Sequence, residues 1–176
     1  MAGIDGWTRT YRLSASKRIA KFSALISDSS DSGNITGALY CSLPSGQNVG
    51  PVAGVTVEHY VEPNQFYPQD TDPSTITGTT PASPYASLLG GTNPAVADIG
   101  PTLQYAGQAR CYAASGNITA GALVCIADAY GRVDTPTSLG ISAGNKVYPV
   151  GIARSKSTKV NDVVLVELNF DPVTTW

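Results

Sequence analysis

Short alternating or continuous apolar stretches mark the C-terminal half of the chain. Residues 162–170 (DVVLVELNF) alternate, so that every second residue from Val164 to Phe170 falls on one side of an extended chain. Residues 122–127 (ALVCIA) are apolar on both sides, which is typical of a central strand or a barrel wall. Residues 148–153 (YPVGIA) form a shorter candidate whose proline suits a strand start or an edge. The pattern predicts a protein built mainly from short β-strands.

One stretch, residues 14–26 (SASKRIAKFSALI), has a spacing that also suits a helix. Ile19, Phe22 and Ile26 recur at intervals of three and four residues, which would place them on one helical face. The same residues fit a strand, and the sequence leaves both readings open.

The chain contains two copies of one pattern of turn, strand, loop and glycine-containing strand. The matched segments are SGNITGALYC (32–41) with SGNITAGALVC (115–125), and PVAGV (51–55) with PVGIA (149–153). This alignment places Cys41 opposite Cys125. We interpret the copies, over about residues 32–61 and 115–170, as two related β units packed in one compact barrel or sandwich. The alternative is that short sequences typical of β-strands recur by chance.

A proline-rich insertion, about residues 62–95, separates the two copies. Its prolines, together with many serines and threonines, prevent a regular strand ladder. Long loops of this kind within a compact domain are usually functional or mobile. Phe66, Tyr67 and Tyr85 give this loop side chains that we expect to pack on its own domain or on a neighbour.

Composition and charge refine this picture. Glycine and proline, at 18 and 12 of 176 residues, with only 14% charged residues, argue against a helical bundle. Five of the eleven basic residues lie near the N-terminus: Arg9, Arg12, Lys17, Arg18 and Lys21. Residues 22–109 contain seven acids and no lysine or arginine. We therefore expect an extended basic arm (1–27) on an acidic β domain (28–176), unless the arm is merely a solvated segment.

The basic segment invites a comparison with nucleic-acid-binding proteins. Trp7 and Tyr11 alternate with its arginines, a composition suited to base stacking and phosphate contact. The acidic body would repel phosphate, so we do not expect a nucleic-acid partner. We expect no membrane span either, because no apolar run approaches ~20 residues. The N-terminus lacks a signal-peptide pattern, which favours synthesis in a cytoplasm.

Motifs that would indicate chemistry are lacking. His59 is the only histidine, so a Ser-His-Asp or Cys-His enzyme would have to use it, and Glu58 points to the other face of the strand pattern. There is no phosphate-binding or dinucleotide-binding glycine motif. A calcium site around Asp70 and Asp72 would lack EF-hand spacing. We therefore expect no catalytic residue, no cofactor and no metal.

The cysteines and the sequons are read as structural features. Cys41, Cys111 and Cys125 are odd in number and have no CxxC spacing, so we expect buried, small apolar side chains. Asn34 and Asn117 begin Asn-Ile-Thr sequons, which we attribute to turn chemistry and not to glycosylation.

Residues 115–133 and 148–168 resemble the capsid cement, or head decoration, proteins of tailed bacteriophages. The matching stretches are SGNITAGALV, AYGRV, PVGIARS and DVVLVEL. The family usually has an aspartate where this chain has Asn117, and often a glycine after positions like Ala153, which this chain lacks. The resemblance extends through the repeat to about residues 32–60 and does not cover the proline-rich loop.

The resemblance implies a protein without catalysis that binds the major capsid protein on the outside of an assembled capsid. It implies a homotrimer, placed where three capsomers meet, that stabilises the head against the pressure of packaged DNA and resides on the virion. On this reading the basic arm (Arg9, Arg12, Lys17, Arg18, Lys21) and the loop aromatics (Phe66, Tyr67, Tyr85) are the candidate contact residues.

A second function class competes with this one. A carbohydrate- or receptor-binding β module of a phage tail would use exposed aromatic rings as stacking platforms. The candidates for that role are Trp7, Tyr60, Tyr67, Tyr85 and Tyr130.

Overall fold

The computed structural model of the chain describes residues 7–10, 12–13, 19–27, 40–58 and 101–174. These residues form β-strands, turns and loops and contain no helix, so the expectation of a mainly β protein is confirmed. The strands are β1 (Thr8–Thr10), β2 (Arg12–Leu13), β3 (Ala24–Ser27), β4 (Tyr40–Ser42), β5 (Val52–Thr56), β6 (Thr102–Gln104), β7 (Gln108–Tyr112), β8 (Leu123–Ile126), β9 (Val133–Asp134), β10 (Lys146–Val147), β11 (Pro149–Ala153), β12 (Val163–Leu168) and β13 (Val173–Thr174).

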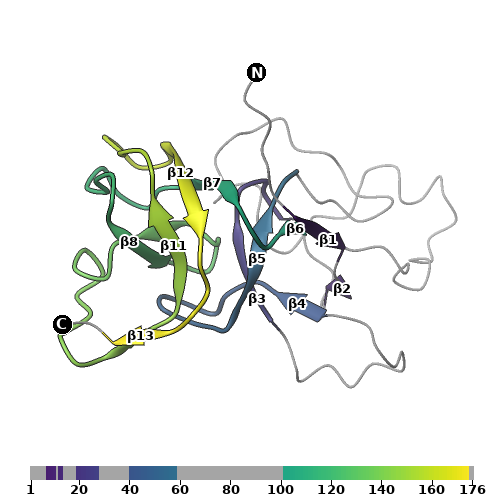
Figure 1. Cartoon of the computed structure of the whole chain (residues 1–176), viewed down its shortest axis with the longest axis horizontal. Helices are drawn as coiled ribbons and strands as arrows, with labels where there is room; N and C mark the ends of the chain where they lie inside the picture. Colours follow the sequence, from purple (N-terminus) through teal and green to yellow (C-terminus); the bar gives the residue numbers. More distant parts are fainter. Residues whose placement is uncertain (1–6, 11, 14–18, 28–39, 59–100, 175–176) are drawn as a thin grey trace, which may run out of the picture.

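Most strands belong to two sheets that lie side by side in Figure 1. The first has six strands in the order β1-β6-β5-β3-β4-β2, and the second has five in the order β7-β12-β11-β8-β9. Neighbouring strands are antiparallel, except for β2 and β4. A small sheet joins β10 to β13. We call the described residues between 7 and 105 unit 1, and residues 107–174 unit 2.

Each sheet closes on itself through one short parallel contact. In unit 1, β2 comes directly after β1 in the chain and pairs in parallel with β4, near the opposite edge of the sheet. In unit 2, Ala113 follows β7 directly and forms a parallel bridge to Val133 of β9. In each unit, the chain that continues from the first strand therefore pairs with the opposite edge of the sheet, and each sheet becomes a small barrel with few free backbone groups.

The two units share one topology. Each of five strands of unit 1 has a counterpart at the same sheet position in unit 2. The pairs are β1 with β7, β3 with β8, β4 with β9, β5 with β11, and β6 with β12. The register agrees residue by residue, because Leu25 pairs with Gly54 as Val124 pairs with Gly151. Directly beside each glycine the register shifts, and both glycines have a φ of +157°. The same small barrel is thus built twice, but with other bounds than expected: the first copy runs from β1 to β6 and not over about residues 32–61, and the second begins at β7, before residue 115.

The correspondence extends into the backbone before each central strand. The Phe22 amide donates to the Thr56 carbonyl at 2.7 Å, and the Gly121 amide donates to the Ala153 carbonyl at the same distance. Phe22 and Gly121 both have a positive φ, 65° and 89°. Unit 1 therefore accepts a phenylalanine in a backbone conformation for which unit 2 uses glycine.

This correspondence corrects the alignment of the two SGNIT stretches. Cys41 lies in β4, whose counterpart is β9, whereas Cys125 lies in β8, whose counterpart is β3. The placement of Cys41 opposite Cys125 is therefore wrong, although the glycine strands β5 and β11 do correspond. The two similar sequences align the wrong strands because the equivalence of two strands is defined by their pairing register and their position in the sheet. A short sequence match contains neither property. Residues 32–39 lie outside the described residues.

The N-terminal segment also differs from its expected form. β1 and β3 are strands of the six-stranded sheet, and Ile19, Ala24 and Leu25 are fully buried. Over its described residues the segment is therefore part of unit 1 and not a separate basic arm. The helix considered for residues 14–26 is wrong for Ala24–Ser27, which is β3, because tertiary pairing on both sides decides the conformation.

The interiors of the two barrels are filled from equivalent positions. In unit 1, the buried apolar cluster consists of five side chains, and the side chains at the five equivalent positions of unit 2 are buried as well. The pairs are Ile19 with Ile118, Leu25 with Val124, Cys41 with Val133, Ala53 with Val150, and Leu103 with Val166. Two leucines, one cysteine and one alanine in unit 1 thus replace four valines. The larger and smaller side chains offset each other, so two different sequences fill one shape at similar density.

Unit 1 packs on unit 2 through the outer face of β3 and β5. Ala24, Val52 and Val55 belong to one continuous apolar cluster with the interior of unit 2. Asn48, with a φ of +51°, adds polar contacts between the units. Its side-chain oxygen accepts from the Tyr148 amide at 2.9 Å, and its side-chain nitrogen donates to the Lys146 carbonyl at 2.9 Å. The two barrels are therefore fixed together.

The paired glycines generate the first prediction. A Cβ on Gly54 would lie 2.7 Å from the Gln104 carbonyl oxygen, and one on Gly151 would collide with the Glu167 carbonyl oxygen. We expect Gly54→Ala and Gly151→Ala each to lower the free energy of unfolding by about 3 kcal/mol, because neighbouring backbone must move. Gly46→Ala is the matched control, since nothing lies within 4 Å of its added methyl. Equal denaturant midpoints for the three variants would contradict the close approach.

Asn48 provides a second prediction. Asn48→Gly keeps the positive φ but removes both side-chain hydrogen bonds, and we expect a loss of about 1–2 kcal/mol in the free energy of unfolding. Asn48→Ala should cost about 1 kcal/mol more, because alanine is strained at positive φ. Ser45→Ala, at an exposed position of the same loop, is the control and should change stability by less than about 0.5 kcal/mol. Unchanged unfolding of Asn48→Gly would show that this junction contributes nothing.

Candidate partner-binding surfaces

The structure describes part of the predicted contact set. Arg9 lies exposed on β1, Arg12 lies in β2, and Lys21 lies half-buried in the turn before β3. The Lys21 ammonium is 5.3 Å from the ring centroid of Phe22. Several residues named from the sequence lie outside the described residues: Lys17, Arg18, Asn34, His59, Tyr60, Phe66, Tyr67, Asp70, Asp72 and Tyr85.

Arg9 belongs to an exposed cluster with Trp7 and Tyr105, which we call the aromatic patch. Trp7 is 73% exposed, and its ring packs with the Tyr105 ring in a T-shaped arrangement, with centroids 6.4 Å apart and planes at 85°. The Arg9 guanidinium lies 5.1 Å from the centroid of the Tyr105 ring. The pairing of β1 with β6 creates the cluster, because it aligns the chain before β1 with the chain after β6. The Tyr105 amide donates to the Trp7 carbonyl at 3.0 Å.

Comparison of the units shows that the fold does not require this patch. By strand register, Trp7, Arg9 and Tyr105 correspond to Gly107, Ala109 and Leu168 of unit 2. Unit 2 makes the same backbone contact, from the Leu168 amide to the Gly107 carbonyl, without aromatic or charged side chains there. The patch is therefore an addition to unit 1. Tryptophan, tyrosine and arginine are the residues most enriched at binding hot spots.

Carboxylates near the surface of unit 2 hold turns. Asp128 accepts from the backbone amides of Tyr130 and Arg132 and forms an ion pair with the Arg132 side chain at 2.7 Å. Asp162 accepts from the Thr158 amide and hydroxyl and from the Lys159 amide, and the Thr158 bonds chiefly lower the pKa of its carboxyl. These acids stabilise backbone. Among the described residues, no cluster of three or more His, Cys, Asp or Glu side chains could hold a metal ion.

Tyr130 is a weaker stacking platform than the sequence indicated. Its side chain is half-buried, and the Arg132 guanidinium lies 5.6 Å from the centroid of its ring. Arg132 is itself held by Asp128 and by the side-chain oxygen of Asn161, at 3.0 Å. Trp7 is therefore the most exposed ring among the described candidates for the stacking role.

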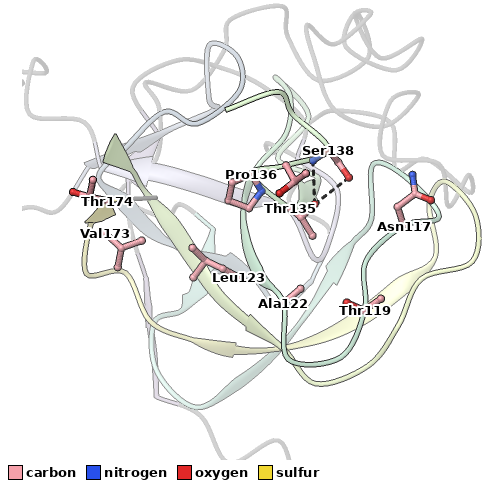
Figure 2. Close-up of a pocket in the computed structure, with 10 residues that line it drawn as sticks. Asn117, Thr119, Ala122, Leu123, Thr135, Pro136, Ser138, Val173 and Thr174 are labelled. Carbon is pink, nitrogen blue, oxygen red and sulfur yellow. Dashed lines mark hydrogen bonds between the residues drawn. The ribbon is translucent and has the colours of Figure 1, made fainter. Parts of the chain in front are cut away.

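An open groove of about 560 Å³ lies on unit 2 (Figure 2). Its walls come from the start of β8, from the turn after β9 and from β13. The residues that line it are Asn117, Thr119, Ala122, Leu123, Thr135, Pro136, Thr137, Ser138, Val173 and Thr174. The Thr135 hydroxyl donates to the Ser138 hydroxyl at 3.0 Å and accepts from the Ser138 amide at 3.2 Å. All of these lining residues are uncharged, so the groove suits an uncharged, partly apolar partner segment.

Sequence reasoning found only part of these surfaces. Trp7 and Arg9 were named from composition, but their partner Tyr105 was not. Tyr105 is almost one hundred residues away in the chain, and only the β1–β6 pairing brings it near. Among the groove residues, Asn117 stands out in the sequence only as the start of a sequon. The sequence does not indicate that these residues line a groove.

The cysteines are free and buried, as expected. Burial raises the pKa of the Cys111 thiol to about 12, and burial followed by the nearby Asp134 carboxylate raises that of Cys125 to about 12. Because the thiolate is the nucleophile, these side chains act as small apolar core residues.

Thiol labelling tests this assignment. In a Cys41→Ala variant at pH 8, Cys111 and Cys125 should react with an aromatic disulfide reagent at least about 1,000-fold more slowly in the native protein than in guanidinium. A pKa near 12 leaves that much less thiolate than the ordinary thiol pKa of 9.0, and burial adds to the difference. Reaction of the native protein at the rate of the denatured protein would overturn this assignment.

A scan of protein-family models and a search of curated proteins both find no match to this chain. No helix in the described part is long and apolar enough to cross a membrane.

Proposed function

We propose that this protein is a structural subunit that binds the outer surface of a tailed-bacteriophage capsid and cements its capsomers. The observation that carries the proposal is the aromatic patch, an exposed tryptophan beside a tyrosine whose ring also contacts an arginine, on a rigid, twice-built frame. The equivalent positions of unit 2 have no such side chains, so the fold of unit 1 does not require the tryptophan, tyrosine and arginine of the patch. The resemblance of residues 115–133 and 148–168 to cement proteins directs the patch toward a capsid.

The proposed mechanism is mechanical and needs no catalysis. A subunit that buries surface on two adjacent capsomers makes their separation cost its own binding free energy as well. Many copies then act together through avidity, even when each contact is weak. Two closed, mutually packed barrels suit this task because they transmit load without opening an exposed sheet edge. We place the protein on the virion exterior as a homotrimer bound to the major capsid protein.

Within this proposal, Trp7 is the central anchor and Tyr105 and Arg9 complete its contact surface. Aromatic and arginine side chains at the centre of an interface contribute most of the binding free energy. Arg12, Lys17, Arg18 and Lys21 are proposed as electrostatic contacts, which speed association more than they tighten it. Phe66, Tyr67 and Tyr85 are proposed as further apolar contacts.

One observation favours a second candidate, a carbohydrate-binding module. A tryptophan that is 73% exposed and fixed by a neighbouring ring offers a flat face on which a sugar ring can stack. Glycan-array binding that disappears in Trp7→Ala, without capsid binding, would select this function.

The capsid proposal predicts ordered decoration. Purified protein mixed with undecorated capsids of tailed phages should give density at three-fold positions in electron cryomicroscopy. Trp7→Ala should weaken binding by about 30-fold, the loss of about 2 kcal/mol that is typical of a hot spot. Val160→Ala, at a 51% exposed valine on unit 2, is the matched control and should bind normally. Absence of any capsid binding, or equal binding by Trp7→Ala, would contradict the proposal.

A further inference from the structure

The β8–β9 turn of unit 2 docks on unit 1 at the start of β3. The Ala24 amide donates to the Gly131 carbonyl at 2.8 Å. A Cβ on Gly131 would lie 2.5 Å from the Ala24 carbonyl oxygen and 3.0 Å from the Ser23 Cβ. The turn therefore sits against the backbone of unit 1 so closely that only glycine fits. This contact continues the sheet of unit 1 beyond the end of β4, which pairs with β3 only at Ile26 and Ser27.

The counterpart of this docking site on unit 2 is the open groove. Ser23 and Ala24 correspond by register to Ala122 and Leu123, which form one groove wall. The loops after β4 and β9 also correspond, since β4 and β9 take the same place beside β3 and β8. Both loops continue with a buried proline, Pro44 in unit 1 and Pro136 in the groove.

The turns of these two loops agree in backbone conformation as well. Asn48 and Gly140, four residues after the respective prolines, have positive φ values of 51° and 69°. In unit 1 the site beside β3 is filled by Gly131, whereas in unit 2 the corresponding residues face the open space shown in Figure 2. One face of a repeated barrel is thus occupied in the first copy and vacant in the second.

We propose that the groove of unit 2 receives a second copy of this chain, since the equivalent face of unit 1 already receives unit 2 within one chain. A second copy is the occupant that the fold itself indicates, because the equivalent site already binds the same kind of barrel. The uncharged lining, with Leu123, Pro136 and Val173 among hydroxyl groups, matches a contact made from backbone hydrogen bonds and small apolar surfaces.

Such a contact is head to tail, because it joins different surfaces of two identical chains. A head-to-tail contact closes into a ring when its rotation divides a full turn, and otherwise extends into a filament. The inference does not rest on capsid binding. It goes beyond the proposed function by assigning the surface through which copies of the chain contact one another.

The test is self-association of the full chain without capsids. Sedimentation velocity and native mass spectrometry over a range of concentrations should reveal multiples of the 18.2 kDa chain, as one closed ring or as a series of filament lengths. Leu123→Glu places a charge in the groove and should weaken association by at least about 30-fold, as for loss of a hot spot. Ser138→Arg is the second groove variant; it alters an exposed residue and tests the groove even if Leu123→Glu fails to fold.

Val163→Glu is the matched control, because Val163 is 46% exposed on β12 and does not line the groove. It should associate like the original chain. A protein that stays monomeric at every concentration, or association that survives both folded groove variants, would overturn the inference. Self-association without capsid binding would instead contradict only the proposed function.

Discussion

The structure depends on the close approach of backbone to backbone at one glycine in each barrel. Gly54 and Gly151 sit where β5 and β11 cross next to the neighbouring strand, with no room for a side chain. Beside each glycine one extra residue, Ala53 or Val150, is inserted between the pairs and is buried inside its barrel. The resulting bulge bends the strand, and such bending is what closes a small sheet on itself. Closure of each barrel therefore depends on its own glycine.

A frame that closes twice leaves the outer side chains free for other roles. The interior is set by five equivalent positions in each barrel, and these tolerate different side chains as long as the volume is kept. The outer positions differ more between the units. Unit 1 carries the aromatic patch where unit 2 has Gly107, Ala109 and Leu168. Unit 2 has an open groove at the face that, in unit 1, contacts the β8–β9 turn of the same chain. These differences on a shared scaffold are the basis for proposing both surfaces as partner contacts.

The sequence predicted the β class and the strongest strands, because alternation and glycine placement are local properties. β8, β11 and β12 fall within the stretches 122–127, 148–153 and 162–170. β3 was ambiguous, since Ile19, Phe22 and Ile26 fit helix and strand alike, and the SGNIT words suggested the wrong strand equivalence. Three features depend on pairings between residues far apart in the sequence, which no local pattern contains. They are the closure of unit 1 through β2, the contact of Trp7 with Tyr105, and the groove.

The central claim, that one barrel is built twice, is tested most directly by amide hydrogen exchange resolved to single residues. The amides of Val57 and Arg154 donate to equivalent carbonyls in the two units, as do those of Tyr105 and Leu168. The account predicts that both members of each pair are protected and that protection rises toward β5 and β11 in both units. Protection confined to unit 2, with free exchange at Val57 and Tyr105, would contradict it.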